Sequence, residues 1–175
     1  MLLRVYEWDL IQSGRIYGLI AMLAGSAGVL SGPIVLRLMS NKDIRAPHFK
    51  LAIFGISMAT LSLIMLPFQP NVNIALIFVT LASFFVTLPL AGTSSAMVIV
   101  SPNRIRGVIT GIYVVVTSVF GLVLGPFLVA SSTDFIFQDP TAIAKSLALV
   151  SVLIGPIGIF FMLKGINYFG EMKNV

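Results

Sequence analysis

The sequence contains no cysteine and only one histidine, and charged side chains make up 10% of its 175 residues. Without cysteine the chain has no disulfide, no thiolate nucleophile and no thiolate metal ligand. His48 falls in a basic loop, where we expect a solvated side chain. The sequence also lacks a Ser/His/Asp set, zinc-ligand spacing and a phosphate-binding glycine loop. We therefore expect no enzymatic activity, cofactor or metal site.

The scarcity of charge also argues against a water-soluble protein. Hydrophobic residues make up 58% of the chain, whereas soluble domains carry about a quarter charged residues. Eleven lysines and arginines with six aspartates and glutamates are too few to cover a water-facing surface. The net charge of +5 does not indicate a nucleic-acid partner, because the charges lie between apolar runs, as orientation signals of membrane proteins do. The apolar surface should instead contact membrane lipid.

What the chain does contain is long apolar runs. A membrane-spanning helix needs roughly 17–25 mostly apolar residues, and continuous runs without apolar/polar alternation favour helices over a barrel. We predict an all-α membrane protein, a bundle of about five transmembrane helices within 15–166, preceded by an outer turn at 1–14 and followed by a cytoplasmic tail at 167–175. The predicted spans are 15–37, 49–66, 72–100, 107–131 and 143–164.

Basic residues are divided unequally between the two sides of the predicted bundle. Five spans place the two termini on opposite sides, with eight basic residues on one side and three on the other. The positive-inside rule makes the richer side cytoplasmic. We therefore expect a multi-pass protein of the cell (inner) membrane with its N-terminus outside and its C-terminus in the cytoplasm. The eight are Arg37, Lys42, Arg45, Lys50, Arg104, Arg106, Lys164 and Lys173, and the three are Arg4, Arg15 and Lys145.

Small residues recur at helical spacing in two of the spans. Such a stripe lets two helix backbones approach closely, so it favours a partner helix over lipid. Glycine-rich faces also let helices rock against one another, so a role along a solute path is the alternative. The first span carries Gly14, Gly18, Ala21, Gly25, Gly28 and Gly32, and the fourth carries Gly121 and Gly125 before Pro126. We predict helix packing for Gly18, Gly25, Gly28, Gly32, Gly121 and Gly125.

Hydroxyl groups line one face of the third span and one face of the fourth. These faces could border a polar cavity, or the hydroxyls could bond to carbonyls of their own helix. The third span also contains Pro89, which would break it. The candidates for solute contact in a cavity are Thr87, Ser94, Tyr113 and Thr117.

The motif Ser101-Pro102-Asn103-Arg104-Ile105-Arg106-Gly107, followed by Tyr113, Gly121-x-x-x-Gly125-Pro126 and Thr133-Asp134, resembles the major facilitator superfamily. More narrowly, it is similar to the spinster-like permeases around their tenth and eleventh helices. Tyr6-Glu7-Trp8-Asp9 and the glycine-rich span resemble the outer turn and eighth helix of the same fold. The resemblance covers essentially the whole chain, as helices eight to twelve. It implies that Arg104 and Arg106 are cytoplasmic-loop charges.

The resemblance also implies a function. The chain would be the C-terminal portion of a secondary transporter that moves a small or amphipathic solute by alternating access. The solute would be lipid-like, as the spinster resemblance implies, or a small organic anion or drug. Transporters of this type bind their solute between two halves, so the expected partners are the solute and either a missing N-terminal half or another copy of the chain. The alternative is a non-transporting membrane subunit, or an inactive remnant, that assembles through small-residue helix faces.

Overall fold

The computed structural model describes residues 8–41, 46–90, 93, 102, 104–139 and 142–172, with side chains up to residue 166. Among these residues no strand occurs, so the predicted all-α membrane bundle is confirmed. The α-helices are α2 (Leu10–Ser40), α3 (Pro47–Met65), α4 (Val72–Thr87), α6 (Arg106–Ser118), α7 (Gly125–Ser131) and α8 (Ile143–Met172). A short 3-10 helix, η1 (Leu66–Phe68), follows α3, and two π-helical segments, η2 (Val119–Leu124) and η3 (Ser132–Phe137), flank α7.

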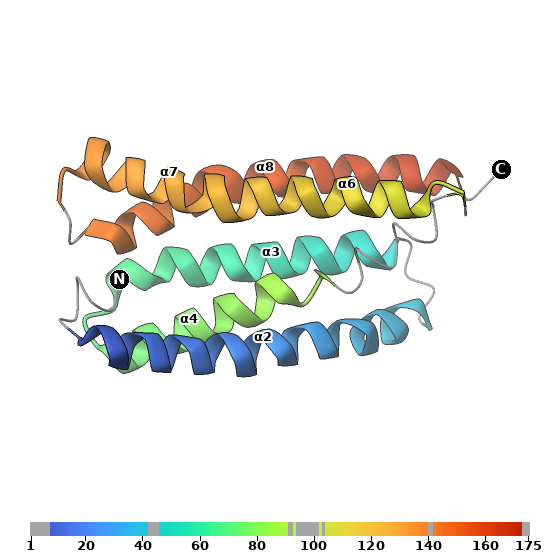
Figure 1. The fold of residues 1–175 in the computed structure, drawn as a ribbon. Coiled ribbons are helices and arrows are strands. Elements are labelled where there is room, and N and C mark those ends of the chain that lie inside the picture. The colour runs from blue at the N-terminus through green and yellow to red at the C-terminus, as the bar shows by residue number, and fades with distance from the viewer. Residues whose placement is uncertain are drawn as a thin grey trace.

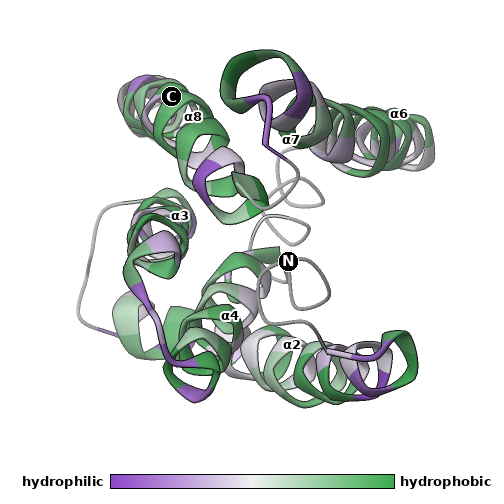
Figure 2. Cartoon of the chain, turned by 90° about the vertical axis from the view of Figure 1, so that its left-hand side faces the viewer, coloured by the Kyte–Doolittle hydropathy of each residue, from purple (hydrophilic) through white to green (hydrophobic). Residues whose placement is uncertain are grey.

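The helices lie side by side and run alternately up and down the bundle. The segments α6, η2, α7 and η3 form one continuous rod that returns along α8 (Figure 1). The helix α2 begins at one end of the bundle and α8 ends at the other (Figure 1). In the end-on view of Figure 2, α2, α4 and α3 form one group, α8 adjoins α3, and α6 stands at the edge.

Four of the described helical stretches are long and apolar enough to cross a membrane. They are Leu10–Ser40, Pro47–Phe68, Arg106–Phe137 and Ile143–Ile166. Large hydrophobic side chains such as Leu30, Phe120 and Phe161 are exposed on them, and Figure 2 shows hydrophobic residues over most of the ribbon. The chain is therefore built as a membrane-embedded bundle, with its apolar side chains turned outward where lipid would lie.

The helix α4, which is not among these four stretches, is shorter than its predicted span. It ends at Thr87 after 16 residues, or about 24 Å at 1.5 Å per residue, whereas the hydrocarbon core of a bilayer is about 30 Å thick. Leu88 and Pro89 follow it directly, and proline interrupts the hydrogen bonding of a helix. The rest of the predicted span, apart from Leu90 and Thr93, lies outside the described residues.

The other spans are longer than predicted because helices continue past the apolar runs. The helix α2 starts at Leu10, five residues before the predicted start, and the rod that begins at Arg106 continues to Phe137. Pro126 lies inside this rod and cannot donate a backbone hydrogen bond. The π-helical turn η2 directly before it widens the helix at that point, as π-bulges do elsewhere. The helix therefore continues past Pro126 to Phe137.

Small residues bring the helices into close contact. A Cβ at Gly55 of α3 would lie 2.7 Å from the carbonyl oxygen of Phe85 of α4, and one at Gly155 of α8 would lie 2.7 Å from the hydroxyl of Thr60 of α3. The buried apolar residues are also mostly small: Ala24, Ala52, Ala59, Ala75, Ala82, Ala142 and Ala144 are among them. Close approach of backbones, which van der Waals packing stabilises in membranes, therefore holds α2, α3, α4 and α8 together.

Candidate functional site

The most unusual element is the rod Arg106–Phe137. The most hydrophobic part of this rod is long enough to cross a membrane and is described in full. None of its residues is buried. The main contacts of α6 are with its own continuation η2, and the rod packs on α8 mainly through α7 and η3. Val108, Ile112 and Val115 are exposed on α6. The helix that carries two of the predicted solute contacts therefore faces no other described helix closely.

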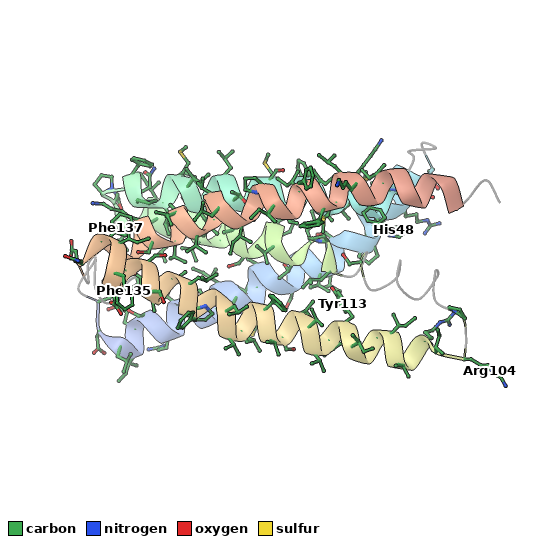
Figure 3. All side chains as sticks on the ribbon, turned by 90° about the horizontal axis from the view of Figure 1, so that it is seen from above. His48, Arg104, Tyr113, Phe135 and Phe137 are labelled. Carbon is green, nitrogen blue, oxygen red and sulfur yellow. The ribbon has the colours of Figure 1, made fainter. Side chains whose placement is uncertain are left out.

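Tyr113 and Thr117 lie one turn apart on α6. Tyr113, labelled in Figure 3, is half-buried, and Thr117 is exposed. The hydroxyl of Thr117 donates to the carbonyl oxygens of Tyr113 at 2.8 Å and Val114 at 3.1 Å. Thr110 likewise donates to the carbonyl of Arg106 at 2.9 Å. The hydroxyls of both threonines thus bond to carbonyls of their own helix, and they lie on an open face and not in an enclosed cavity.

Thr87 lies at a helix contact. Its hydroxyl donates to the carbonyl oxygens of Ser83 at 2.9 Å and Phe84 at 3.1 Å. Its side chain also touches α2, because a Cβ at Gly28 would overlap the Thr87 hydroxyl and lie 2.5 Å from the carbonyl oxygen of Phe84. Thr87 is half-buried and contacts α2. Ser94, the remaining candidate for solute contact, lies outside the described residues.

The six glycines predicted to pack have different surroundings. Gly28 and Gly32 are buried on α2, and a Cβ at Gly25 would contact Thr87 at 3.9 Å. By contrast, a Cβ at Gly18 would meet nothing within 4 Å. The same holds for Gly121 and Gly125 on the exposed rod. The stripe on α2 thus meets α4 at Gly25 and Gly28 and not at Gly18, and the glycines of the rod face open space.

The two ends of the bundle differ in chemistry. His48 and Arg104 lie at one end, and Phe135 and Phe137 lie at the other (Figure 3). Arg104 is exposed, whereas Arg106 is half-buried and its Nε has no hydrogen-bond partner. At the same end Lys164 places its Nζ 4.9 Å from the ring centre of Phe160. The described arginines of the predicted cytoplasmic loop therefore share one end with other basic residues.

A pair of buried hydroxyls joins η3 to α8, and the sequence interpretation assigned it no role. Thr133 and Ser146 are 2% and 0% exposed, and their hydroxyl oxygens lie 2.8 Å apart. Each also lies within hydrogen-bonding distance of a carbonyl of its own segment, that of Val129 or Ala142. Thr133 belongs to the Thr133-Asp134 motif, but nothing in the sequence showed that it would meet Ser146.

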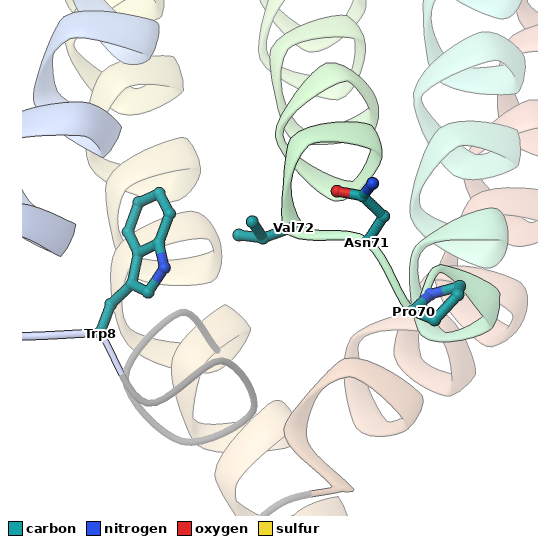
Figure 4. Close-up of a pocket in the computed structure, with 4 residues that line it drawn as sticks. All are labelled: Trp8, Pro70, Asn71 and Val72. Atoms are coloured by element: carbon teal, nitrogen blue, oxygen red, sulfur yellow. The ribbon is translucent and has the colours of Figure 1, made fainter.

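Two hollows lie near the end of the bundle at which α2 begins. One, of about 540 Å³, lies between α7–η3 and α8 and is bordered by Gly125, Thr133 and Asp134. The other, of about 440 Å³, is shallow and lies between Trp8 and the start of α4 at Pro70, Asn71 and Val72 (Figure 4). Asn71 is occupied in capping α4, because its Oδ1 accepts from the backbone N–H of Asn73 at 2.9 Å. Neither hollow includes Thr87, Tyr113 or Thr117.

Comparison of the chain with models of protein families, with curated proteins and with solved structures gave no match. The membrane-embedded helical bundle therefore rests on the structure. The resemblance to the major facilitator superfamily rests on the sequence motifs alone and stays a prediction.

Proposed function

We propose that the chain is one helical bundle of a secondary transporter, the C-terminal portion of a permease of the major facilitator type. It would move a small or amphipathic solute by alternating access, with a second bundle forming the other wall of the solute path. The single observation that carries this proposal is the exposure of the rod Arg106–Phe137. The rod is apolar and long enough to span a membrane, but its most hydrophobic part contains no buried residue.

The exposed face of the rod suits contact with another bundle better than contact with lipid. Thr110, Tyr113, Thr117 and Gly121 recur at spacings of three or four residues, so they share one side of the helix. Gly121 and Gly125 offer open space where a second backbone could approach closely. Solute sites of secondary transporters lie between such bundles near the middle of the membrane.

Threonines whose hydroxyls bond to their own helix remain able to contact a solute. A hydroxyl that donates to its own helix keeps acceptor capacity on its oxygen, so Thr117 could accept a hydrogen bond from a solute donor. The phenol of Tyr113 supplies both a donor and an aromatic face. We therefore retain Tyr113 and Thr117 as the proposed solute contacts. Arg104 and Arg106 would remain outside the membrane as cytoplasmic-loop charges.

The proposed orientation follows from the basic residues. The helix directions place Arg37, Lys50, Arg104 and Lys164 toward the same end of the bundle. By the positive-inside rule this end is cytoplasmic. The start of α2 then lies outside and the end of α8 inside, in the cell (inner) membrane.

A second candidate function is a non-transporting membrane subunit. The open space at Gly121 and Gly125 also suits a permanent helix–helix interface with another protein. Such a subunit would bind its partner but would contribute no group to a solute path. Solute transport separates the two candidates.

Transport in proteoliposomes tests the proposal. A fluorescent short-chain lysolipid and the cationic dye ethidium serve as probes. Alone, the purified chain should show no saturable uptake of either. Reconstituted with helices one to seven of a spinster-like permease, it should show uptake that Tyr113→Ala reduces. Saturable uptake by the 175 residues alone, lost in Tyr113→Ala and Thr117→Ala, would overturn the two-bundle proposal and indicate a homo-oligomeric transporter.

A further inference from the structure

A third hollow lies inside the bundle, at the end where α2 begins. Its volume is about 460 Å³, and α2, α3 with η1, α4 and α8 all contribute to its wall. Leu66, Ala82 and Leu147 are among the apolar residues that border it. Binding sites for small molecules are mostly apolar hollows of about 300–1,000 Å³ with a few polar groups. In size and position between helices this hollow resembles such a site.

One polar group in its wall lacks a partner. Ser13 borders the hollow and is 7% exposed, and its hydroxyl oxygen is buried without a hydrogen bond. The other buried hydroxyls of the described residues, those of Ser62, Ser132, Thr133 and Ser146, all lie within hydrogen-bonding distance of a carbonyl of their own segment. Ser13 is thus the exception. A buried polar group left unsatisfied is costly, so its hydroxyl calls for a partner inside the hollow.

The wall restricts the chemistry of that partner. Among the described residues that border it, the polar side chains are Ser13, Tyr17 and Ser83, and none is an acid, lysine, arginine or histidine. An ionised group would lose its hydration there without gaining a counter-ion, which is strongly unfavourable. A lone water is also a poor partner, because a buried water needs two to four polar groups and the wall is mainly apolar. The occupant should be uncharged and largely apolar, with one oxygen that meets Ser13.

The hollow has an entrance suited to a chain-like molecule. Leu10 and Tyr17 border it on α2 and are 68% and 55% exposed. These two positions are seven residues apart, or about 10 Å along the helix at 1.5 Å per residue. Exposed apolar side chains on a spanning helix face the region that lipid tails occupy, so an alkyl chain could enter from the side of the bundle.

We infer that this hollow binds a neutral amphipathic molecule, an alkyl or acyl chain that carries one hydroxyl or carbonyl oxygen hydrogen-bonded to Ser13. The chain contacts the leucine and alanine side chains of the wall. The same chemistry is present in a free long-chain alcohol and in the ester region of a bilayer lipid. This hollow involves neither α6 nor transport, so the test of its occupant is independent of the test of the proposed function.

Photolabelling of the purified full chain in detergent tests this inference. The probe is a long-chain alcohol with a diazirine in its chain, and the matched probes are the carboxylate and the alkane of equal length. The alcohol should label residues 10–17 and 79–83 saturably, and unlabelled alcohol should compete. The carboxylate and the alkane should label these residues several-fold less. Equal labelling by all three probes, or no saturable labelling of either segment, would overturn the inference.

Two substitutions, each with a matched control, separate binding from folding. Ser13→Ala removes the hydroxyl and should weaken alcohol binding about three- to tenfold, whereas Ser26→Ala, at an exposed position of the same helix, should not. Gly14→Leu adds bulk at a position that borders the hollow and has open space, and should abolish labelling. Gly158→Leu, at an open position on α8, should not. Unchanged binding in Ser13→Ala would contradict the assignment.

Nanodiscs distinguish the two sources of the occupant. A phosphatidylcholine with a diazirine in one acyl chain replaces the free alcohol. If it labels the same segments and the alcohol displaces it, the natural occupant is a bilayer lipid. If only the free alcohol labels them, the occupant is a separate solute. Both results support a neutral, oxygen-bearing chain at Ser13.

Discussion

The surroundings of single glycines decide how much each contributes to packing. Gly28 and Gly18 belong to the same stripe on α2, but only Gly28 is enclosed by the backbone and Thr87 side chain of α4. Gly28→Leu should therefore force α2 and α4 apart and lower the free energy of unfolding by roughly 1–3 kcal/mol, as overpacking does. Thermal unfolding in detergent measures this effect.

Gly18→Leu is the control for that prediction, because its added side chain enters open space. It should leave the unfolding temperature nearly unchanged, and Gly25→Leu, at ordinary contact distance from Thr87, should fall between the two. Equal stability of all three variants would mean that α2 does not pack on α4 as described.

The hydrogen bond between Thr133 and Ser146 joins two helical segments and can be measured by a double-mutant cycle. Thr133→Val and Ser146→Ala should each destabilise the chain, and the coupling between them should be about 0.6 kcal/mol and no more than about 1.7, as for hydrogen bonds between membrane helices. Thr117→Val replaces Thr133→Val in the control cycle, since Thr117 bonds only to its own helix. A coupling of zero for the first pair would contradict the contact.

Periodicity in the sequence revealed which residues share a helix face, but not what that face meets. The spacing of the α2 glycines located a small-residue stripe, yet it could not show that the stripe contacts α4 at Gly28 and not at Gly18. Gly55 makes a close contact with α4, but it lies outside any glycine repeat and was not singled out. Ser13 was missed for a similar reason, because an unpartnered hydroxyl becomes visible only when the surrounding helices are in place.

At the scale of helices, the contact between α3 and α8 is close enough for a disulfide. A Cβ at residue 155 would lie 3.4 Å from the Cβ of Thr60, and Cβ atoms in disulfides are about 3.5–4.5 Å apart. Because the chain has no cysteine, Thr60→Cys with Gly155→Cys introduces the only pair. Mild oxidation should link them quantitatively, as gel mobility with and without reductant will show.

The pair Thr117→Cys with Gly155→Cys is the control, since α6 carries no buried residue and packs mainly on η2, whereas Gly155 faces Thr60 of α3. It should remain reduced within one chain. Linkage of the control pair but not of the α3–α8 pair would show that the bundle is arranged differently.

Helix boundaries were harder to predict than helix existence. Each predicted apolar run corresponds to a described helix, because a bilayer demands continuous apolar helices. The ends shifted since polar residues such as Gln12 and Arg15 continue α2 beyond its apolar part. Pro126 likewise did not shorten the rod, because a π-helical turn precedes it. Hydropathy does not record either effect.

At the scale of the whole molecule, the uneven distribution of basic residues predicts one orientation. Pro70, in the turn before α4, should lie outside, and Ser40, at the end of α2, should lie in the cytoplasm. In intact cells an impermeant maleimide should label Pro70→Cys and not Ser40→Cys, with the reverse in inside-out vesicles. Labelling of Pro70→Cys only from the cytoplasmic side would contradict the proposed topology.

Site-specific photo-crosslinking can capture the second helical bundle against which we propose that the exposed rod packs in the membrane. A benzophenone amino acid is placed at Thr117 of α6 and, as the lipid-facing control, at Phe161 of α8, which is 66% exposed. After illumination of native membranes, adducts are identified by mass spectrometry. We expect position 117 to link to a multi-helix membrane protein and position 161 to link mainly to lipid. Lipid adducts alone at both positions would contradict this proposal.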